Sequence, residues 1–187
     1  MHKLIFRALF LSLLLIFPLS AEDIGGVTLE KQLMRSGNTL LLQGAGVREK
    51  FFIDLYVAGL YTATPNHNAQ KIIDADAPMT IRLHIISKLI TSEKMQKATN
   101  EGFEKSTHHN TAPLNDAIKT FIAVFDEPIV KGDLFELLYI PNQGVSIYKN
   151  GLRKQTIKGL AFKKALFGIW LGKESAQESL KKELVGK

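Results

Sequence analysis

Cysteine is absent from the 187-residue sequence. Without a thiol the chain forms no disulfide, carries no thiolate nucleophile and offers no cysteine ligand for zinc. The same absence excludes a lipid anchor attached through cysteine. The fold must therefore depend on a hydrophobic core, and hydrophobic residues, at 45% of the chain, are numerous enough to build one.

Histidine is scarce, with five in the chain. His108 and His109 are adjacent in a polar segment, so they do not make the i, i+4 pair with which a helix binds a metal. His84 falls in a predicted strand with no second ligand beside it. The sequence also lacks the G-x-S-x-G elbow of many serine hydrolases. We therefore predict no metal site and no ordinary serine hydrolase.

Charge of one sign does not accumulate along the chain. The formal net charge is +6 at pH 7, but the basic residues are interspersed with acids. A basic run with interleaved aromatics, which is typical of nucleic-acid binders, is missing, so we predict no nucleic-acid partner. Gly44-x-Gly46 does not continue as a dinucleotide fingerprint, because Glu49 stands where a third glycine is needed. We therefore predict no nucleotide cofactor and no other cofactor.

Residues 1–21 have the features of a secretory signal peptide. Lys3 and Arg7 give a positive start, Ala8–Phe17 is apolar, and Pro18–Ala21 supplies a helix breaker and a small residue. A membrane-spanning helix needs about 20 apolar residues, and this run is shorter. We expect cleavage, export with no membrane span left, and a periplasmic location if the source is a Gram-negative bacterium. An uncleaved anchor is the alternative.

The remaining residues, 22–187, are predicted to form a single α+β domain. Strands come first and two helices then follow in succession, which favours α+β over alternating α/β. Strand patterns cover residues 27–33, 39–42, 51–61, 79–86, 134–140 and 145–148, with Asn150-Gly151 as a hairpin turn. Helical patterns cover residues 69–74, 92–106, 114–125, 162–171 and 175–185.

Arg48 is the strongest candidate functional side chain. Its guanidinium can bind a carboxylate, a phenolate or an enolate through two parallel hydrogen bonds. Gly44 and Gly46 precede it, and glycine allows a positive φ or a close approach, so we expect a sharp bend that presents Arg48. A structural ion pair between Arg48 and Asp54, or another acid, is the alternative.

Phe51–Tyr61 is predicted to be a central strand, because both of its alternating faces are largely apolar. Tyr56 lies on one of these faces and needs a hydrogen-bond partner if it is buried. Arg82 and His84 share one face of a later strand, and we expect that face to be in contact with solvent. Trp170 is expected to pack in the core.

The sequence resembles the chalcone isomerase family, and in particular its secreted bacterial members. The residues that carry the resemblance are Gly44-x-Gly46-x-Arg48, the strand end Tyr56–Tyr61 and the segment Ile169–Gly172, and the similarity runs from about Gly25 to Leu184. The resemblance implies an open-faced β-sandwich, in which a large antiparallel sheet packs against a layer of helices. A ligand cleft would lie between the two layers.

The family's enzymes close a chalcone to a flavanone, and an arginine holds the attacking oxyanion. By resemblance that arginine is Arg48, whereas the threonine and tyrosine that contact the ketone through water fall at Tyr56 and near Lys94. The family's asparagine falls near Glu101 and its second threonine near Ile169. Loss of these polar groups removes most of the electrostatic stabilisation of such a reaction. The catalytic residues are therefore unknown, and the predicted ligand-binding residues are Arg48, Tyr56, Lys94 and Ile169.

Relatives that keep this fold without the enzyme activity bind fatty acids through an arginine and a tyrosine. The resemblance therefore implies a non-catalytic binder of a small amphipathic anion, such as a fatty acid, with Arg48 and Tyr56 on the carboxylate. One alternative is an intramolecular lyase acting on an enone or chalcone-like substrate, with a perturbed acid or base near Arg48. A second alternative is an envelope interaction protein that has no ligand, whose cleft is closed and whose Arg48 is paired internally.

Overall fold

The computed structural model describes residues 21–187. The expected signal peptide over residues 1–21 therefore lies outside the described residues, except for Ala21 at the start of the first strand. From residue 21 onward, no helix is both long and apolar enough to cross a membrane.

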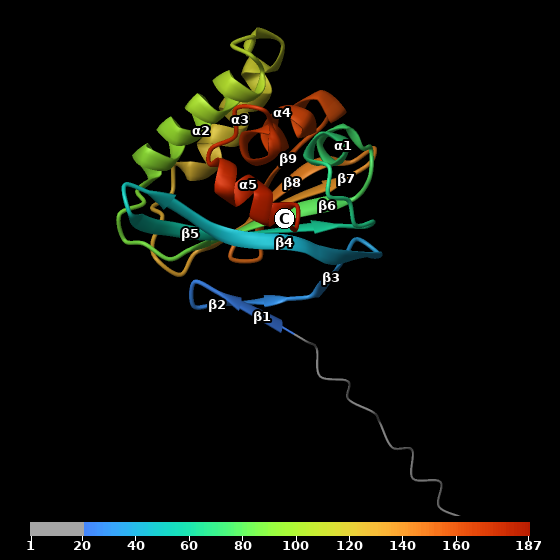
Figure 1. Ribbon diagram of the computed structural model, residues 1–187. Helices are drawn as coiled ribbons and strands as arrows, with labels where there is room; N and C mark the ends of the chain where they lie inside the picture. Colours follow the sequence, from blue (N-terminus) through green and yellow to red (C-terminus); the bar gives the residue numbers. More distant parts are fainter. Residues whose placement is uncertain (1–20) are drawn as a thin grey trace, which may run out of the picture.

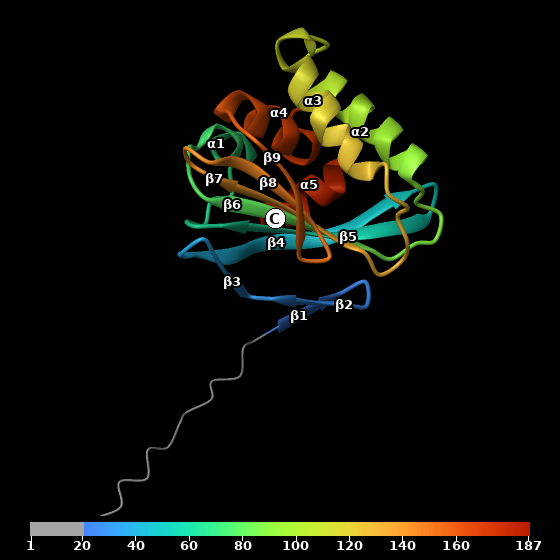
Figure 2. The same cartoon turned by 180° about the vertical axis from the view of Figure 1, so that it is seen from behind.

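A seven-stranded antiparallel sheet forms the body of the protein (Figure 1). Each strand pairs with the next strand in the sequence, so the order in the sheet is the order in the chain. Figures 1 and 2 show that the sheet is curved around the helices. The strands are β3 (Gln32–Arg35), β4 (Asn38–Lys50), β5 (Ile53–Thr62), β6 (Met79–Ile85), β7 (Leu134–Ile140), β8 (Gly144–Lys149) and β9 (Leu152–Ile157).

Helices cover one face of this sheet and lie above it in both views (Figures 1 and 2). They are α1 (Ala69–Asp74), α2 (Ser92–Ser106), α3 (Asn115–Ile122), α4 (Leu160–Leu171) and α5 (Glu178–Leu184), with 3₁₀ turns at Ala112–Leu114 and Ala123–Phe125 on either side of α3. The predicted fold class, an α+β open-faced sandwich, is confirmed. The predicted start of α2 is also correct, because the Thr91 hydroxyl accepts a hydrogen bond from the Lys94 backbone N–H.

A separate hairpin, β1 (Ala21–Ile24) and β2 (Val27–Glu30), packs against the opposite face of the sheet (Figure 1). Leu29 of this hairpin is fully buried, and Glu30 binds Arg82 of β6 at 2.7 Å. The sequence predicted one strand over residues 27–33. Instead the chain bends at Lys31, so that β2 crosses the face of the sheet while β3 joins its edge.

The expectation that Arg82 and His84 lie on a solvated face is wrong. Only 7% of Arg82 is exposed, and the His84 Nε2 atom is buried without a hydrogen-bond partner among residues 21–187. The strands that cover this face come from a segment about fifty residues earlier, so the local pattern of β6 gave no sign of them. Burial, together with the nearby Arg82 cation, lowers the pKa of His84 to about 4. The Glu30 charge raises this pKa, but its effect is smaller than that of Arg82.

Aromatic rings fill the space between the helices and the sheet. Phe103 of α2 meets Phe121 of α3 edge to face, with centroids 5.8 Å apart, and Phe162 of α4 lies within 5.9 Å of both rings. Phe125 continues the cluster to Phe135 of β7 at 5.3 Å. Buried aromatic pairs contribute beyond the apolar area that they remove from water. This cluster therefore fixes the helix layer on the sheet.

A buried lysine ties α4 to α1. Lys163 is fully buried, and its Nζ donates hydrogen bonds to the carbonyl oxygens of Ile72, Ile73 and Ala75 at 2.7–2.8 Å. These carbonyls belong to the end of α1, where the helix leaves acceptors without intrahelical donors. Burial and the nearby Lys164 charge lower the pKa of Lys163 to about 8, while the charges of Asp74 and Asp76 act in the opposite direction.

The predicted bend at Gly44 and Gly46 does not exist, because both glycines lie in the middle of the 13-residue strand β4. Neither has a positive φ. The glycines instead allow α5 to approach closely: a Cβ on Gly44 would collide with the Glu183 carbonyl oxygen, and one on Gly46 with the Glu183 carboxylate. The glycine pair therefore serves close packing rather than a turn.

The sharp turn of this region lies at Phe51 and Phe52, which the sequence analysis had assigned to a strand. Their φ values are 53° and 62°, and their side chains are 82% and 96% exposed. A left-handed conformation costs a non-glycine residue about 1–2 kcal/mol, and exposed rings regain little of that by packing. At the β8–β9 turn the positive φ values fall on the predicted pair Asn150-Gly151, and asparagine and glycine adopt this conformation readily.

We expect Gly44→Ala to lower the free energy of unfolding by about 1–3 kcal/mol, because the new methyl group meets a backbone carbonyl that cannot move alone. Gly46→Ala is the matched control. Its methyl group mainly meets the end of the flexible Glu183 side chain, so the loss should be smaller. Urea unfolding of both variants measures the difference. Equal losses would contradict the close-approach account.

The low pKa of His84 predicts a pH dependence of stability. Between pH 6.5 and about 4 the unfolded chain binds a proton at this residue that the folded protein does not, so stability should fall as the pH is lowered. The contribution is at most about 3 kcal/mol. His84→Gln should lose less stability over this range than the parent, whereas His108→Gln, in an exposed loop, should behave like the parent. Identical acid profiles for all three proteins would refute the prediction.

Candidate functional site

Arg48 and Tyr56 lie directly opposite each other on β4 and β5. Residues in register on antiparallel strands point to the same face of a sheet. Tyr56 belongs to the core beneath the helices, so the pair faces the helix layer. Arg48 is half-buried and Tyr56 is only 8% exposed. The structure thus brings together two of the four predicted ligand-binding residues.

The Tyr56 hydroxyl is held by Trp170 of α4. The Trp170 indole Nε1 donates to the Tyr56 oxygen at 3.0 Å, and only 7% of Trp170 is exposed. Burial raises the pKa of Tyr56, although the Trp170 hydrogen bond and the nearby Arg48 charge act in the opposite direction. Tyr56 is therefore a neutral phenol at physiological pH, with its own proton free to be donated.

Gln177, immediately before α5, covers Arg48. Arg48 Nη1 donates to the Gln177 Oε1 atom at 2.9 Å and also to the Glu49 carbonyl oxygen. The same Gln177 oxygen accepts from the Glu49 backbone N–H at 2.9 Å. The alternative of an Arg48–Asp54 ion pair is not observed, and no ion pair within residues 21–187 involves Arg48. Arg48 is thus a cation whose described partners are neutral.

Lys94 and Ile169 do not join this group by hydrogen bonds. Lys94 is exposed in the first turn of α2, where its Nζ donates to the Leu89 carbonyl oxygen at 3.1 Å. Ile169 is 6% exposed and packs on α2, because a Cβ on Gly102 would meet its side chain. A ligand-binding role for either residue stays a prediction.

Sequence reasoning missed Gln177, and it treated Trp170 only as core packing. Trp170 carried one usable signal, since a buried indole N–H normally finds an acceptor and Tyr56 was already expected to need a partner. Gln177 carried none, because it falls in the first turn of the predicted helix 175–185, where a polar residue is expected to face solvent.

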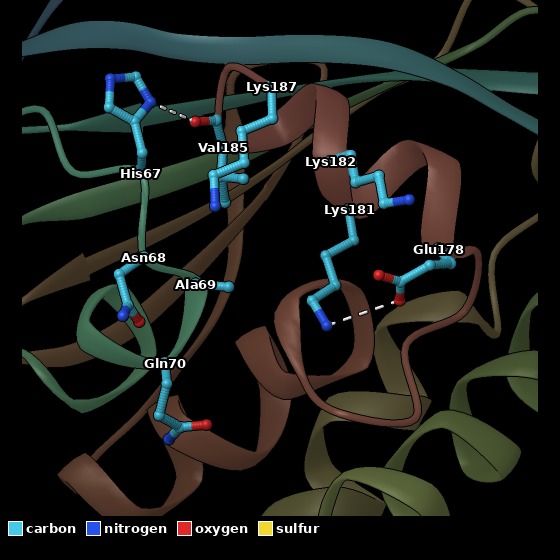
Figure 3. Close-up of a pocket in the computed structure, with 9 residues that line it drawn as sticks. All are labelled: His67, Asn68, Ala69, Gln70, Glu178, Lys181, Lys182, Val185 and Lys187. Atoms are coloured by element: carbon cyan, nitrogen blue, oxygen red, sulfur yellow. Dashed lines mark hydrogen bonds and ion pairs between the residues drawn. The ribbon is translucent and has the colours of Figure 1, made fainter.

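The cavities that the structure describes lie elsewhere. The larger has a volume of about 340 Å³ and lies between the start of α1 and α5 (Figure 3). His67 donates from Nδ1 to the Val185 carbonyl oxygen at 2.6 Å, and the cavity's one carboxylate, on Glu178, pairs with Lys181 at 3.5 Å. The smaller cavity borders α1 and the end of β5. Neither of these two cavities is lined by Arg48, Tyr56 or Trp170.

Metal binding has no geometric basis in the described part of the chain. Between residues 21 and 187, no three His, Asp or Glu side chains come together in an arrangement that could hold an ion. The chemistry available at Arg48 and Tyr56 is therefore hydrogen bonding to an anion, from a guanidinium and a neutral phenol.

The model of the chalcone isomerase-like family matches residues 21–186, which is nearly every described residue. This chain belongs to the chalcone isomerase-like family. The order of strands and helices and the two-layer arrangement agree with the fold that the resemblance implied. No match was found among curated proteins.

Among solved structures, this chalcone isomerase-like protein is similar to a fatty-acid binding protein of Arabidopsis thaliana. The TM-score is 0.69 at 18% sequence identity, and the match covers 86% of this chain and 92% of the plant protein. At that identity the similarity establishes a shared fold. The secreted, bacterial character of this family member stays a prediction.

The Trp170–Tyr56 hydrogen bond gives a test of the site's geometry. Tyr56→Phe leaves the buried indole N–H without an acceptor, which should lower the free energy of unfolding by about 1–3 kcal/mol. Adding Trp170→Phe removes the orphaned donor as well, so the double variant should lose less than the sum of the two single losses. A thermodynamic cycle from chemical unfolding measures this coupling. Strict additivity would show that the bond is not formed.

Proposed function

We propose that this protein binds a small amphipathic carboxylate, with fatty acids as the leading class, at Arg48 and Tyr56. The observation that carries the proposal is the state of Arg48, a half-buried cation that has neutral hydrogen-bond partners beside a neutral phenol. A guanidinium has five N–H donors and suits a carboxylate. A ligand carboxylate can replace the Gln177 amide on Arg48 and gain a charge-assisted bond.

The ligand's tail would lie in the apolar layer between sheet and helices. Trp170, Ile169 and Met95 belong to the buried core that includes Tyr56. Gln177 already accepts a hydrogen bond from Arg48, so a carboxylate can reach the guanidinium fully only when the Gln177 side chain moves away. The fold shared with a plant fatty-acid binding protein adds support.

The isomerase alternative has weaker support. Such an enzyme would place a perturbed acid or base near Arg48. Tyr56 is near Arg48, but its raised pKa keeps it protonated, so it is a poor base. His84 lies on the opposite face of the sheet, and Lys94 is exposed and bonded to Leu89.

A second candidate is an interaction protein that has no ligand. The observation in its favour is that the Gln177 and Glu49 oxygens already accept hydrogen bonds from one guanidinium nitrogen of Arg48. Export is a further part of our proposal for either function, based on the N-terminal sequence alone. The mass of the protein recovered from its host would reveal whether the N-terminal segment has been removed.

Native mass spectrometry of the gently purified protein, followed by lipid extraction, separates the binder from the interaction protein. The binder should carry an acyl chain that is absent from Arg48→Ala. Lys173→Ala is the matched control, because it removes an exposed positive charge at another place. An empty parent protein that also fails to bind added fatty acid would favour the interaction protein.

Direct titration gives the affinity. Trp170 is the one tryptophan of the chain and bonds to Tyr56, so its fluorescence reports on this site. With palmitate as the probe, Arg48→Ala should weaken binding at least about tenfold, which is the loss expected for a charge-assisted hydrogen bond. Tyr56→Phe should weaken it less, and Lys173→Ala should leave it unchanged. Parental affinity in Arg48→Ala would refute the proposed role of Arg48.

A further inference from the structure

Exposed apolar side chains gather at one end of the sheet. Among the described residues, eight large hydrophobic side chains are exposed, and six of them lie in, or directly next to, four loops: Phe51, Phe52, Ile53, Leu89, Val130 and Leu152. The loops are the β4–β5 turn, the segment after β6, the segment before β7 and the β8–β9 turn. We refer to these four loops as the apolar rim.

Strand pairing places the four loops side by side. The backbone N–H of Ile86 donates to the Leu55 carbonyl, just beyond the β4–β5 turn. Gly132 then donates to the Ile85 carbonyl, and Asn150 to the Leu134 carbonyl. Each loop is thus joined to its neighbour through the strand ends, and Figure 2 shows the four connections along the same end of the sheet.

A basic residue accompanies the apolar residues in every loop of the rim. Lys50 precedes Phe51, Lys88 precedes Leu89, Lys131 follows Val130 and Arg153 follows Leu152, and all four basic side chains are exposed. Lys50 even lies over the Phe51 ring, with its Nζ 5.7 Å from the centroid.

Exposed acids also lie near the rim, but they are paired or stand behind the turns. Asp126, in the loop before β7, accepts a hydrogen bond from Gln96 at 2.8 Å. Asp133, in the loop before β7, is buried and paired with Lys149 at 3.2 Å. Glu127, further back, pairs with Lys154. Glu49 and Asp54 lie on the strands behind the turn, opposite each other in the β4–β5 register. The outermost positions of the rim are therefore apolar or basic.

The β4–β5 turn holds its aromatic pair against local preference. Phe51 and Phe52 occupy the two positive-φ positions of this turn. At the β8–β9 turn the two positive-φ positions are instead Asn150 and Gly151, residue types that adopt this conformation readily. Nothing in the described fold buries either ring. Disfavoured backbone that is not offset by packing points to a function outside the fold.

We propose that the apolar rim docks on the surface of an anionic phospholipid bilayer, with Phe51 and Phe52 inserted at the boundary between headgroups and acyl chains. Surface-binding proteins bury apolar side chains at this boundary while lysine and arginine contact anionic headgroups. A protein partner fits less well, because lysine is depleted at protein interfaces. The proposal does not depend on a fatty-acid ligand, although Arg48 lies on the same hairpin as the aromatic turn.

The decisive experiment measures binding of the full chain to vesicles rich in phosphatidylglycerol and to vesicles of phosphatidylcholine alone. The protein should bind the anionic vesicles, and added salt should weaken the binding. Replacing Lys50, Lys88 and Lys131 one at a time by glutamine should weaken it by about fivefold each. Binding to neither vesicle, or equal binding to both, would overturn the proposal.

The turn itself is tested by the double substitution F51N/F52G. It installs the residues that positive φ favours, so the melting temperature should rise or stay the same, while vesicle affinity should fall about tenfold or more. Met34→Ser, on the edge strand β3, removes an exposed apolar side chain outside the rim and should bind like the parent. Unchanged affinity in a folded F51N/F52G protein would refute insertion of the turn.

A local probe keeps the test valid if the N-terminal segment also binds lipid. The full chains with Phe52→Trp and with Met34→Trp are each bound to vesicles whose acyl chains carry bromine. The fluorescence that the introduced tryptophan adds to that of Trp170 should be quenched by bromine in Phe52→Trp and should not be quenched in Met34→Trp. Equal quenching, or none at position 52, would show that another surface contacts the bilayer. If the parent protein instead forms dimers that F51N/F52G abolishes, without vesicle binding, the rim is a protein interface and the proposal fails.

Discussion

The close contact between α5 and β4 is the constraint on which the helix side of the molecule depends. Gly44 and Gly46 let the backbone of α5 approach until no Cβ would fit. That approach places Gln177 over Arg48 and brings the Val185 carbonyl within reach of the Gln43 amide at 3.3 Å. A larger residue at Gly44 would displace the last helix, and the cover over Arg48 would move with it. Packing geometry at one glycine thus determines the environment of Arg48 beneath the helices.

At the candidate site, the charged Arg48 side chain donates its described hydrogen bonds to neutral groups. Arg48 would be stabilised more by a carboxylate than by the Gln177 and Glu49 oxygens that it contacts. The Tyr56 hydroxyl accepts a hydrogen bond from Trp170, so its own proton can still be donated to a ligand. The protein therefore has two donors for an anion, and Gln177 covers one of them. The energy of binding must exceed the energy of lifting the cover, which would make affinity sensitive to α5 packing as well as to Arg48.

Local sequence patterns predicted local structure well. They did not predict which distant segments pack against a given strand. The Thr91 cap located the start of α2, and Asn150-Gly151 located a turn, because the controlling residues lie within a few positions of the feature. The glycine pair was interpreted as a bend since glycine permits both bends and close contacts, and the deciding partner, Glu183, is far along the chain. Arg82 was misassigned for the same reason. In the site, the sequence itself singled out Arg48 and Tyr56 and the family resemblance gave them a joint role, whereas no pattern marked Gln177.

The order of the strands has a consequence for biosynthesis. Every strand from β4 to β9 pairs with its immediate predecessor, so the sheet can grow as the chain emerges from the ribosome. The Arg48–Gln177 contact is different, because it joins residues 129 positions apart. It forms only when nearly the whole chain is available. A chain that ended before residue 177 could pair all the strands of the sheet and would still leave Arg48 without this cover.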